Sequence, residues 1–300
     1  FRDGKYVADP IFPSRIGIEG SGTIDALGAG VSGFCIGDKV AAIPFLSWDK
    51  QNYWTAESVT RYGIYGESAV VPAYTVAPNP NNISMIEAAA IWCQYLTAWG
   101  GIISYAKLSR DDTALVTAAS SSAGLGGLQI ANLSGATTIA VTRTAGKRQF
   151  LLDAGADHVV VSDDEDLQER VMDITGGEGF SVAYDPVGGE FMADLVAAAR
   201  PCGTIVNYGN LRTEPVNVAI LPMLAKRLDI KFHSLFDTMR ISEERERGIK
   251  YVLDNVASGA LKVIVAKTFT LDQIADAHRY METNMQMGKI VVTAKPRSEI

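Results

Sequence analysis

Residues 113–127 read TALVTAASSSAGLGG. A short apolar run is followed by small residues and then by a helix-forming stretch, which predicts a strand, a tight turn and a helix. Folds that bind dinucleotides place the pyrophosphate at such a turn, because small residues let the backbone approach and the start of the helix offers free N–H groups. We therefore expect a cofactor phosphate to be bound by Ser120, Ser121, Ser122, Ala123 and Gly124.

The glycine pattern of this turn is incomplete. Compared with the G-x-G-x-x-G pattern of dinucleotide-binding turns, Ala119 and Ser121 replace the first two glycines and Gly124 alone remains. The motif taken by itself therefore also fits an ordinary tight turn.

Strand-like and helix-like segments alternate along the middle of the chain. Short continuous apolar runs with helical stretches between them are typical of a parallel sheet that is buried on both faces. Strands are predicted at residues 114–118, 138–142, 158–161, 181–185, 204–208 and 230–233. This pattern predicts an α/β fold with a Rossmann doubly wound parallel sheet.

The predicted second strand ends in a basic segment. Thr142 and Arg143 close the strand, and Lys147 follows, about twenty residues past the glycine turn. NAD-binding chains usually carry an acid there for the ribose diol, and a carboxylate would repel a 2′-phosphate that Arg143 and Lys147 would hold. The segment thus favours NADP(H) over NAD(H), with solvated helix-start charges as the alternative.

The next strands end in turns that also bear on the cofactor. Val187 and Gly188 follow the strand at 181–185, and Gly209 and Asn210 follow the strand at 204–208. Ligands of such sheets bind outside the carboxyl ends of the strands. We expect the backbone of Val187, Gly209 and Asn210 to line the cofactor.

The flanking regions have a different pattern. Residues 1–77 are rich in Gly and β-branched residues and predict antiparallel strands, at 20–27, 40–44 and 68–76. Ser84, three residues before Glu87, predicts a capped helix start. Further helices are expected at 96–106, 242–257 and 271–281, and further strands at 261–265 and 290–293.

Composition excludes several classes of protein. The 300 residues are 47% hydrophobic and carry a net charge of −7, with a pI near 5.1. An acidic chain of this kind is neither a bare nucleic-acid binder nor an anionic-membrane binder. No apolar run approaches the roughly 18 to 20 residues that a membrane span needs. The start does not read as a signal peptide, and the missing initiator Met leads us to expect native sequence upstream of Phe1.

Cysteine usage points to a reducing compartment. The chain has three cysteines, and no two of them form a C-x-x-C pair. Neither a disulfide framework nor a zinc knuckle is expected from them, and a cytoplasmic location is predicted.

A set of ordered motifs resembles the medium-chain dehydrogenase/reductase superfamily. The N-terminal pieces are PSRIGIEGSG at 13–22, GAGV at 28–31 and GDKV at 37–40. Later pieces, which are similar to the zinc-independent NADPH:quinone oxidoreductase branch, are AAA at 88–90, LTA at 96–98, GAD at 155–157, YDPVGG at 184–189 and YGN at 208–210. The resemblance implies a GroES-like β-rich catalytic domain at 1–94 and 236–300, interrupted by a Rossmann domain at 95–235, with the cofactor between them.

The resemblance also bears on zinc. Zinc alcohol dehydrogenases share this fold and take one ligand from a Gly-His-Glu triplet, but the matching triplet here is Gly17-Ile18-Glu19, and isoleucine cannot ligate. Cys93 matches a later thiolate ligand, whereas the four close cysteines of a structural zinc lobe are absent. A catalytic zinc needs three protein ligands, so we expect no metal.

The resemblance implies an NADPH-dependent enzyme that transfers hydride to a quinone or an α,β-unsaturated carbonyl. Tyr6 matches a tyrosine that lines the substrate cleft, and Thr97 matches a threonine near the nicotinamide. A homodimer joined through residues 230–233 is also implied. The alternatives are a zinc-type alcohol dehydrogenase and a non-catalytic, crystallin-like NADPH-binding protein. The loop around Trp48, Tyr53 and Trp54 leaves the substrate unidentified, and Lys289 is expected to be a surface lysine.

Overall fold

The computed structural model describes residues 3–4, 9, 11–13, 15–45 and 61–294. The chain divides into two compact units. The first comprises Phe1–Cys93, Leu253–Gly259 and Val263–Ile300, and the second comprises Gln94–Val252 and Ala260–Lys262. Residues 236–252, which we assigned from the sequence to the GroES-like domain, thus fall in the unit that contains the parallel sheet.

The second unit is built on a parallel sheet of six strands, within residues 113–232, all of which the structure describes. The strands are β4 (Thr113–Val116), β5 (Thr137–Thr142), β6 (His158–Val161), β7 (Phe180–Asp185), β8 (Ala199–Asn207) and β9 (Asp229–Phe232), in the spatial order β6-β5-β4-β7-β8-β9. This is the order of a doubly wound Rossmann sheet, in which the direction of winding reverses between β4 and β7. The predicted fold class is confirmed.

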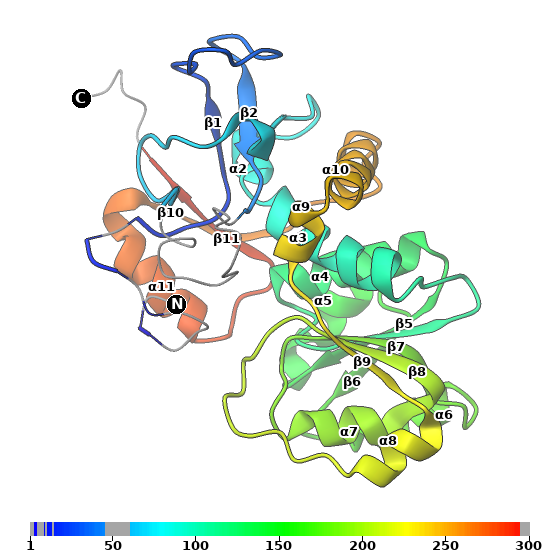
Figure 1. Cartoon of the computed structure of the whole chain (residues 1–300). Helices are drawn as coiled ribbons and strands as arrows, with labels where there is room; N and C mark the ends of the chain where they lie inside the picture. The colour runs from blue at the N-terminus through cyan, green and yellow to red at the C-terminus, as the bar shows by residue number, and fades with distance from the viewer. Residues whose placement is uncertain (1–2, 5–8, 10, 14, 46–60, 295–300) are drawn as a thin grey trace. The chain divides into compact units, whose positions relative to one another are not determined.

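Helices cover both faces of this sheet (Figure 1). The helices α4 (Ser122–Leu133) and α5 (Arg148–Asp153) lie on one face, and α6 (Leu167–Ile174), α7 (Phe191–Ala198) and α8 (Ile220–Lys226) lie on the other. All six residues of β7 are buried, as expected for a strand covered on both sides. Leu115, Phe180 and Ile205 belong to the apolar core between the sheet and α6 and α7.

The segment before the sheet departs from simple α-helix. The helix α3 (Ile91–Ala98) continues as a π-helical stretch, η2 (Trp99–Tyr105), where one α-helix was predicted. A side chain added at Gly100 would collide with Thr238 and with the ring of His233, and one added at Gly101 would collide with Val206. Two helices of this unit, α8 and α9 (Leu235–Arg240), were not anticipated, and α10 (Ser242–Ala257) follows them.

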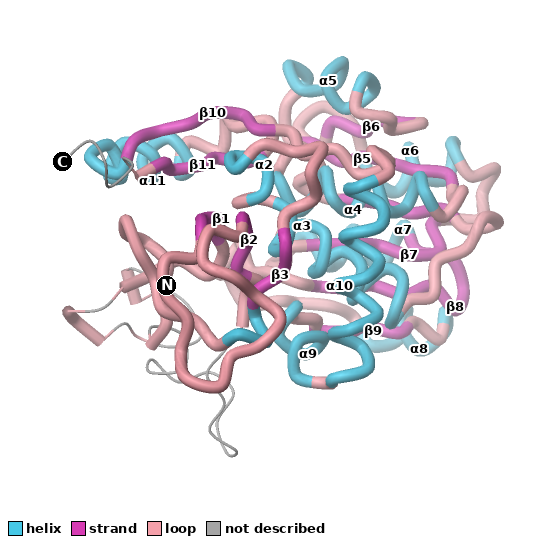
Figure 2. The backbone as a smooth tube through the Cα atoms, turned by 90° about the horizontal axis from the view of Figure 1, so that it is seen from above, coloured by secondary structure: helices cyan, strands magenta, loops and turns pink. Residues whose placement is uncertain are grey.

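The first unit contains an antiparallel sheet and a parallel strand pair. Among the described residues, β1 (Gly20–Thr23), β2 (Lys39–Ala42) and β3 (Val76–Pro78) pair in that order, with Gly20 opposite Ala42. Figure 2 shows β10 (Val265–Thr270) alongside β11 (Lys289–Thr293), with α11 (Ile274–Glu282) beside them. Short 3-10 turns, η1 (Ala73–Thr75) and η4 (Leu271–Gln273), precede β3 and α11.

The capped helix start is confirmed, because Ser84 and Glu87 form a reciprocal capping box ahead of α2 (Met85–Ala88). Two predicted strands are wrong. Residues 68–75 form no strand, because the carbonyl of Pro72 accepts both the N–H and the hydroxyl of Thr75 and closes a 3-10 turn. The strand expected at 261–265 begins at Val265 instead, where pairing with β11 is available.

Candidate cofactor site

The serine-rich turn connects β4 to α4. Thr117 follows the strand, and Ala118 takes a positive φ of 44° that non-glycine residues rarely adopt. Ser121 caps the helix, since its hydroxyl accepts a hydrogen bond from the N–H of Gly124 at 3.0 Å. The first turn of α4 therefore stands at the carboxyl edge of the sheet, with Ser122 and Ala123 partly exposed there.

Gly124 is required by the packing of this turn. A Cβ atom at this position would lie 2.5 Å from the carbonyl oxygen of Ala118 and 2.7 Å from the Cα of Ala119. The helix therefore approaches the turn more closely than any side chain permits. Ala119 and Ser121, by contrast, occupy positions where a small side chain is accommodated, which is why the incomplete glycine pattern still gives this turn.

The basic segment after β5 lies against the same turn. The Nζ atom of Lys147 donates a hydrogen bond to the hydroxyl of Ser120 at 3.0 Å. Burial lowers the pKa of Lys147, and the nearby positive charge of Arg143 lowers it further. Thr142 is buried and Arg143 is exposed. Lys147 thus lies beside one hydroxyl and near a second cationic group, and such a combination of groups is able to bind a phosphate.

The turns after β7 and β8 meet at the same edge. The N–H groups of Leu211 and Arg212 donate to the carbonyls of Pro186 and Val187, each at 2.9 Å. A Cβ atom at Gly209 would lie 3.1 Å from the Cα of Pro186, so this close approach needs glycine. The structure therefore brings Val187, Gly209 and Asn210 together at the carboxyl ends of adjacent strands.

Thr97 is buried on α3. Its carbonyl oxygen lies 3.1 Å from Nε2 of His233, which donates, because a carbonyl can only accept. Burial lowers the pKa of His233 to about 4, so the ring is neutral near pH 7. Tyr6 lies outside the described residues, as do Trp48, Tyr53 and Trp54.

Lys289 is not the surface lysine that we expected. Its ammonium group forms an ion pair with one oxygen of Glu19, whose side chain is 8% exposed. The backbone N–H of Cys93 donates to the other oxygen of Glu19 at 2.8 Å. Burial opposes the charge of Lys289, but Glu19, Cys93 and Tyr65 together leave its pKa raised. This contact could not be predicted from local sequence patterns, because Glu19 and Lys289 lie 270 positions apart.

Among the described residues, those around Glu19 do not form a metal ligand set. Ile18 offers no donor atom, and the carboxylate of Glu19 is already paired with the Lys289 ammonium. Across the described ranges, no three His, Cys, Asp or Glu side chains lie close enough together to form a metal site.

The helices of the described ranges include none whose length and apolar character would let it span a lipid bilayer.

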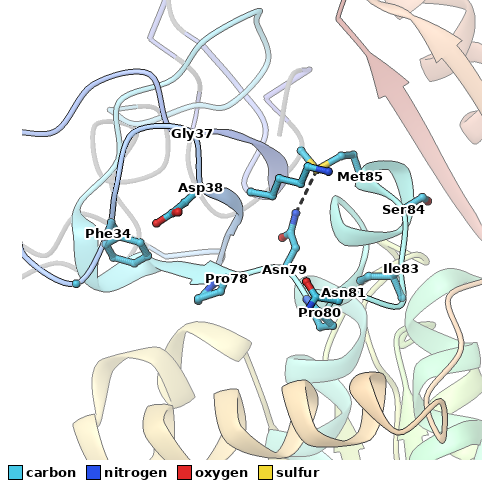
Figure 3. Close-up of a pocket in the computed structure, with 12 residues that line it drawn as sticks. Phe34, Gly37, Asp38, Pro78, Asn79, Pro80, Asn81, Ile83, Ser84 and Met85 are labelled. Carbon is cyan, nitrogen blue, oxygen red and sulfur yellow. Dashed lines mark hydrogen bonds between the residues drawn. The ribbon is translucent and has the colours of Figure 1, made fainter.

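A hollow in the first unit has a volume of about 550 Å³ (Figure 3). Its lining includes Phe34, Asp38, Lys39, residues 78–81 and residues 83–85, and the amide of Asn79 donates to the sulfur of Met85. None of the residues predicted to bind the cofactor lines this hollow.

The strand order of the parallel sheet defines a Rossmann-type unit, and the chain combines it with a second unit that contains an antiparallel sheet. Residues 1–81 match the family described as alcohol dehydrogenase GroES-like domain, and residues 154–292 match the family described as zinc-binding dehydrogenase. The chain belongs to the medium-chain dehydrogenase/reductase superfamily and to its quinone oxidoreductase-like branch. It is thus a member of an oxidoreductase family.

Individual relatives agree with this family. Quinone oxidoreductase 1 of Escherichia coli (strain K12) is 30% identical over 291 residues, which cover 96% of this chain and 84% of that protein. A 2-haloacrylate reductase of a Burkholderia species is 28% identical over 287 residues, which cover 93% of this chain and 81% of the relative.

Solved structures show the same fold. The crystal structure of Escherichia coli quinone oxidoreductase complexed with NADPH superposes with a TM-score of 0.84 at 28% identity, over 97% of this chain and 86% of that one. An NAD-dependent alcohol dehydrogenase also gives 0.84, at 29% identity over 98% and 87% of the two chains.

Proposed function

We propose that this chain is an NADPH-dependent reductase that transfers hydride to a quinone or an α,β-unsaturated carbonyl without zinc. The observation that carries the proposal is the cluster of Ser120, Lys147 and Arg143, because a 2′-phosphate needs cationic partners and an acid would repel it. The E. coli quinone oxidoreductase complexed with NADPH and the 2-haloacrylate reductase support the same chemistry.

In this proposal the residues of the sheet edge bind and orient the cofactor. The N–H groups at the start of α4 and the hydroxyls of Ser121 and Ser122 bind the pyrophosphate. Arg143 and Lys147 bind the 2′-phosphate, Thr142 packs beside them, and the backbone of Val187, Gly209 and Asn210 lines the remainder. Thr97 lies near the nicotinamide.

When bound, NADPH supplies the hydride to the electrophilic carbon of the substrate or to the quinone ring. The product then takes a proton from solvent or from the hydroxyl of Tyr6.

Two features near Glu19 argue against a zinc-type alcohol dehydrogenase, namely the isoleucine at position 18 and the ion pair between the ammonium of Lys289 and the carboxylate of Glu19. One tightly held zinc per purified chain would reverse this part of the proposal.

The test is a fluorescence titration of the purified protein with NADPH and NADH in parallel. Clear preference for NADPH, lost in Arg143→Asp while NADH affinity is kept, supports the phosphate site. Equal loss of both coenzymes in Arg143→Asp would contradict it. Tight NADPH binding without turnover on any quinone or enone would instead support the crystallin-like alternative.

We also propose a homodimer joined through the edge strand β9. Phe232 on this strand is 71% exposed, and Ile220, Leu221 and Leu224 of α8 are at least 68% exposed. Exposed apolar side chains beside an unpaired strand edge favour pairing with a second copy. Light scattering should report a dimer that Leu221→Lys with Phe232→Lys converts to a monomer. A monomeric parent protein would refute this arrangement.

A cytoplasmic location stays a prediction.

A further inference from the structure

Asp185 is the last residue of β7, and its side chain is completely buried. Within the described chain its two carboxylate oxygens accept four hydrogen bonds. Oδ1 accepts from the hydroxyl of Thr117 at 2.5 Å and from the N–H of Val187 at 3.1 Å. Oδ2 accepts from the N–H of Gly188 at 2.9 Å and from the side-chain amide of Asn207 at 3.1 Å. Both oxygens are therefore surrounded by donors.

These donors come from three neighbouring strand ends. Thr117 follows β4 and opens the serine-rich turn, Val187 and Gly188 form the turn after β7, and Asn207 ends β8. Since β4, β7 and β8 are adjacent in the sheet, their carboxyl ends converge on one carboxylate. Asp185 thus links the serine-rich turn to the Val187–Gly188 turn, two of the segments that we assign to the cofactor.

The network extends to the predicted nicotinamide side. The carbonyl of Asn207 accepts a hydrogen bond from the N–H of His233 at 2.8 Å. The ring of His233 in turn donates to the carbonyl of Thr97 at 3.1 Å. A continuous chain of hydrogen bonds therefore runs from Thr117 through Asp185, Asn207 and His233 to Thr97.

A carboxylate suits this position for a chemical reason. It is an acceptor at both oxygens, whereas an amide presents an NH₂ group on one side. At this site an amide in either orientation would direct its N–H donors at a backbone N–H, that of Val187 or that of Gly188. A buried donor that loses its acceptor carries a large desolvation cost, so the loops would move apart to reach water.

We propose that Asp185 is the positioning residue of the cofactor site: it holds the serine-rich turn and the Val187–Gly188 turn at the spacing that a dinucleotide needs, without touching the cofactor. This inference rests on the proposed function. It predicts a loss of affinity that is common to NADPH and NADH, because the linked loops bind the parts that both coenzymes share.

A control residue lies at the amino ends of the strands of the same sheet, opposite the carboxyl ends that we assign to the cofactor. Thr138, at the amino end of β5, donates its hydroxyl to Asp157 at 2.9 Å and its N–H to the same oxygen at 2.8 Å. Thr117 and Thr138 are both at most 1% exposed, and each bonds through its hydroxyl to an aspartate of the same unit. The hydroxyl of Thr138 also accepts from the N–H of Asp157 at 3.1 Å, so Thr138→Val removes one hydrogen bond more than Thr117→Val and is a strict control for lost stability.

The experiment measures the dissociation constants of NADPH and NADH and the melting temperature for the full chain and for Thr117→Val, Thr117→Ser, Thr138→Val and Asp185→Asn. We expect Thr117→Val to weaken both coenzymes about tenfold at an unchanged NADPH-to-NADH ratio, as loss of a hydrogen bond to a charged group implies. Thr117→Ser should restore affinity. Thr138→Val should lower the melting temperature at least as much and leave both dissociation constants within about twofold, since Thr138 lies away from the loops.

Folded Thr117→Val with unchanged affinity, or equal affinity loss in Thr138→Val, would overturn the positioning role. A change in the NADPH-to-NADH ratio would also overturn it, because the effect would then lie at the 2′-phosphate. If Asp185→Asn fails to fold, Thr117→Val still decides the question. Failure of the parent protein to bind either coenzyme would instead refute the proposed function, and the positioning role with it.

Discussion

The Nζ atom of Lys147 lies 3.0 Å from the hydroxyl oxygen of Ser120, although 27 positions separate the two residues in the chain. The contact joins the loop after β5 to the turn after β4, which are neighbouring strands of the parallel sheet. It places a partly buried cation beside the helix start that we assign to the pyrophosphate. The pyrophosphate and the 2′-phosphate of the cofactor would thus bind to adjacent groups of the protein.

Replacing Lys147 with Met should weaken NADPH selectively. Loss of a hydrogen bond to a charged group costs about 1.5–3 kcal/mol, so NADPH affinity should fall by about 10- to 100-fold. NADH lacks the 2′-phosphate and should lose less than about threefold on the same scale. Parallel fluorescence titrations measure both, with exposed Lys250→Met on α10 as the control. Equal losses for the two coenzymes would place Lys147 outside the 2′-phosphate site.

Replacing Gly124 with Ala should damage both folding and cofactor binding. The new methyl group would stand 2.5 Å from the carbonyl oxygen of Ala118, so the turn or the helix must shift. Overpacking of this kind costs about 1–3 kcal/mol, which thermal unfolding detects. Gly22→Ala is the control, because a Cβ atom there meets nothing within 4 Å. Parental stability and affinity in Gly124→Ala would show that the turn can relax.

His233 should make stability depend on pH between about 6.5 and 4. Burial lowers its pKa from 6.5 to about 4, Asp237 partly opposes this shift, and Lys231 adds to it. The unfolded chain therefore binds more protons across this window, and stability falls as the pH falls, by about 3 kcal/mol in total.

Urea unfolding at several pH values checks this prediction. His233→Asn should be less stable at pH 7 and should show a flatter profile between pH 6.5 and 4. The exposed residue His158, replaced by Gln, is the control variant. An identical slope in His233→Asn would assign the pH dependence to other groups.

The ion pair of Glu19 and Lys289 should show strong coupling. Lys289→Met would leave the carboxylate of Glu19 buried without its cation, which costs about 3 kcal/mol. Glu19→Gln combined with Lys289→Met should cost less than Lys289→Met alone, because the neutral amide still accepts from the N–H of Cys93. A double-mutant cycle by chemical denaturation measures this coupling, and additive losses would contradict it.

Local patterns were sufficient for most elements of the parallel sheet. The apolar run at 158–161 forms β6, and Ser84 with Glu87 forms the predicted cap, because each depends on residues adjacent in the chain. The strand predicted at 68–76 was wrong, although the contact that decides this segment is also local. Pro72 contributes its carbonyl to a turn, and that choice depends on Thr75 rather than on the β-branched composition of the segment.

The sequence by itself determined the alternation of strands and helices, the small-residue turn at 117–124 and the basic ending of β5, because hydrophobic periodicity and turn chemistry are local properties. Only the tertiary structure decided that Lys147 meets Ser120, that Lys289 is buried against Glu19, and that Asp185 gathers donors from three strand ends. The distant pairs among these residues lie 22 to 270 positions apart. Strand order in the sheet and the pairing of distant segments bring such side chains together. No single stretch of the chain determines either of them.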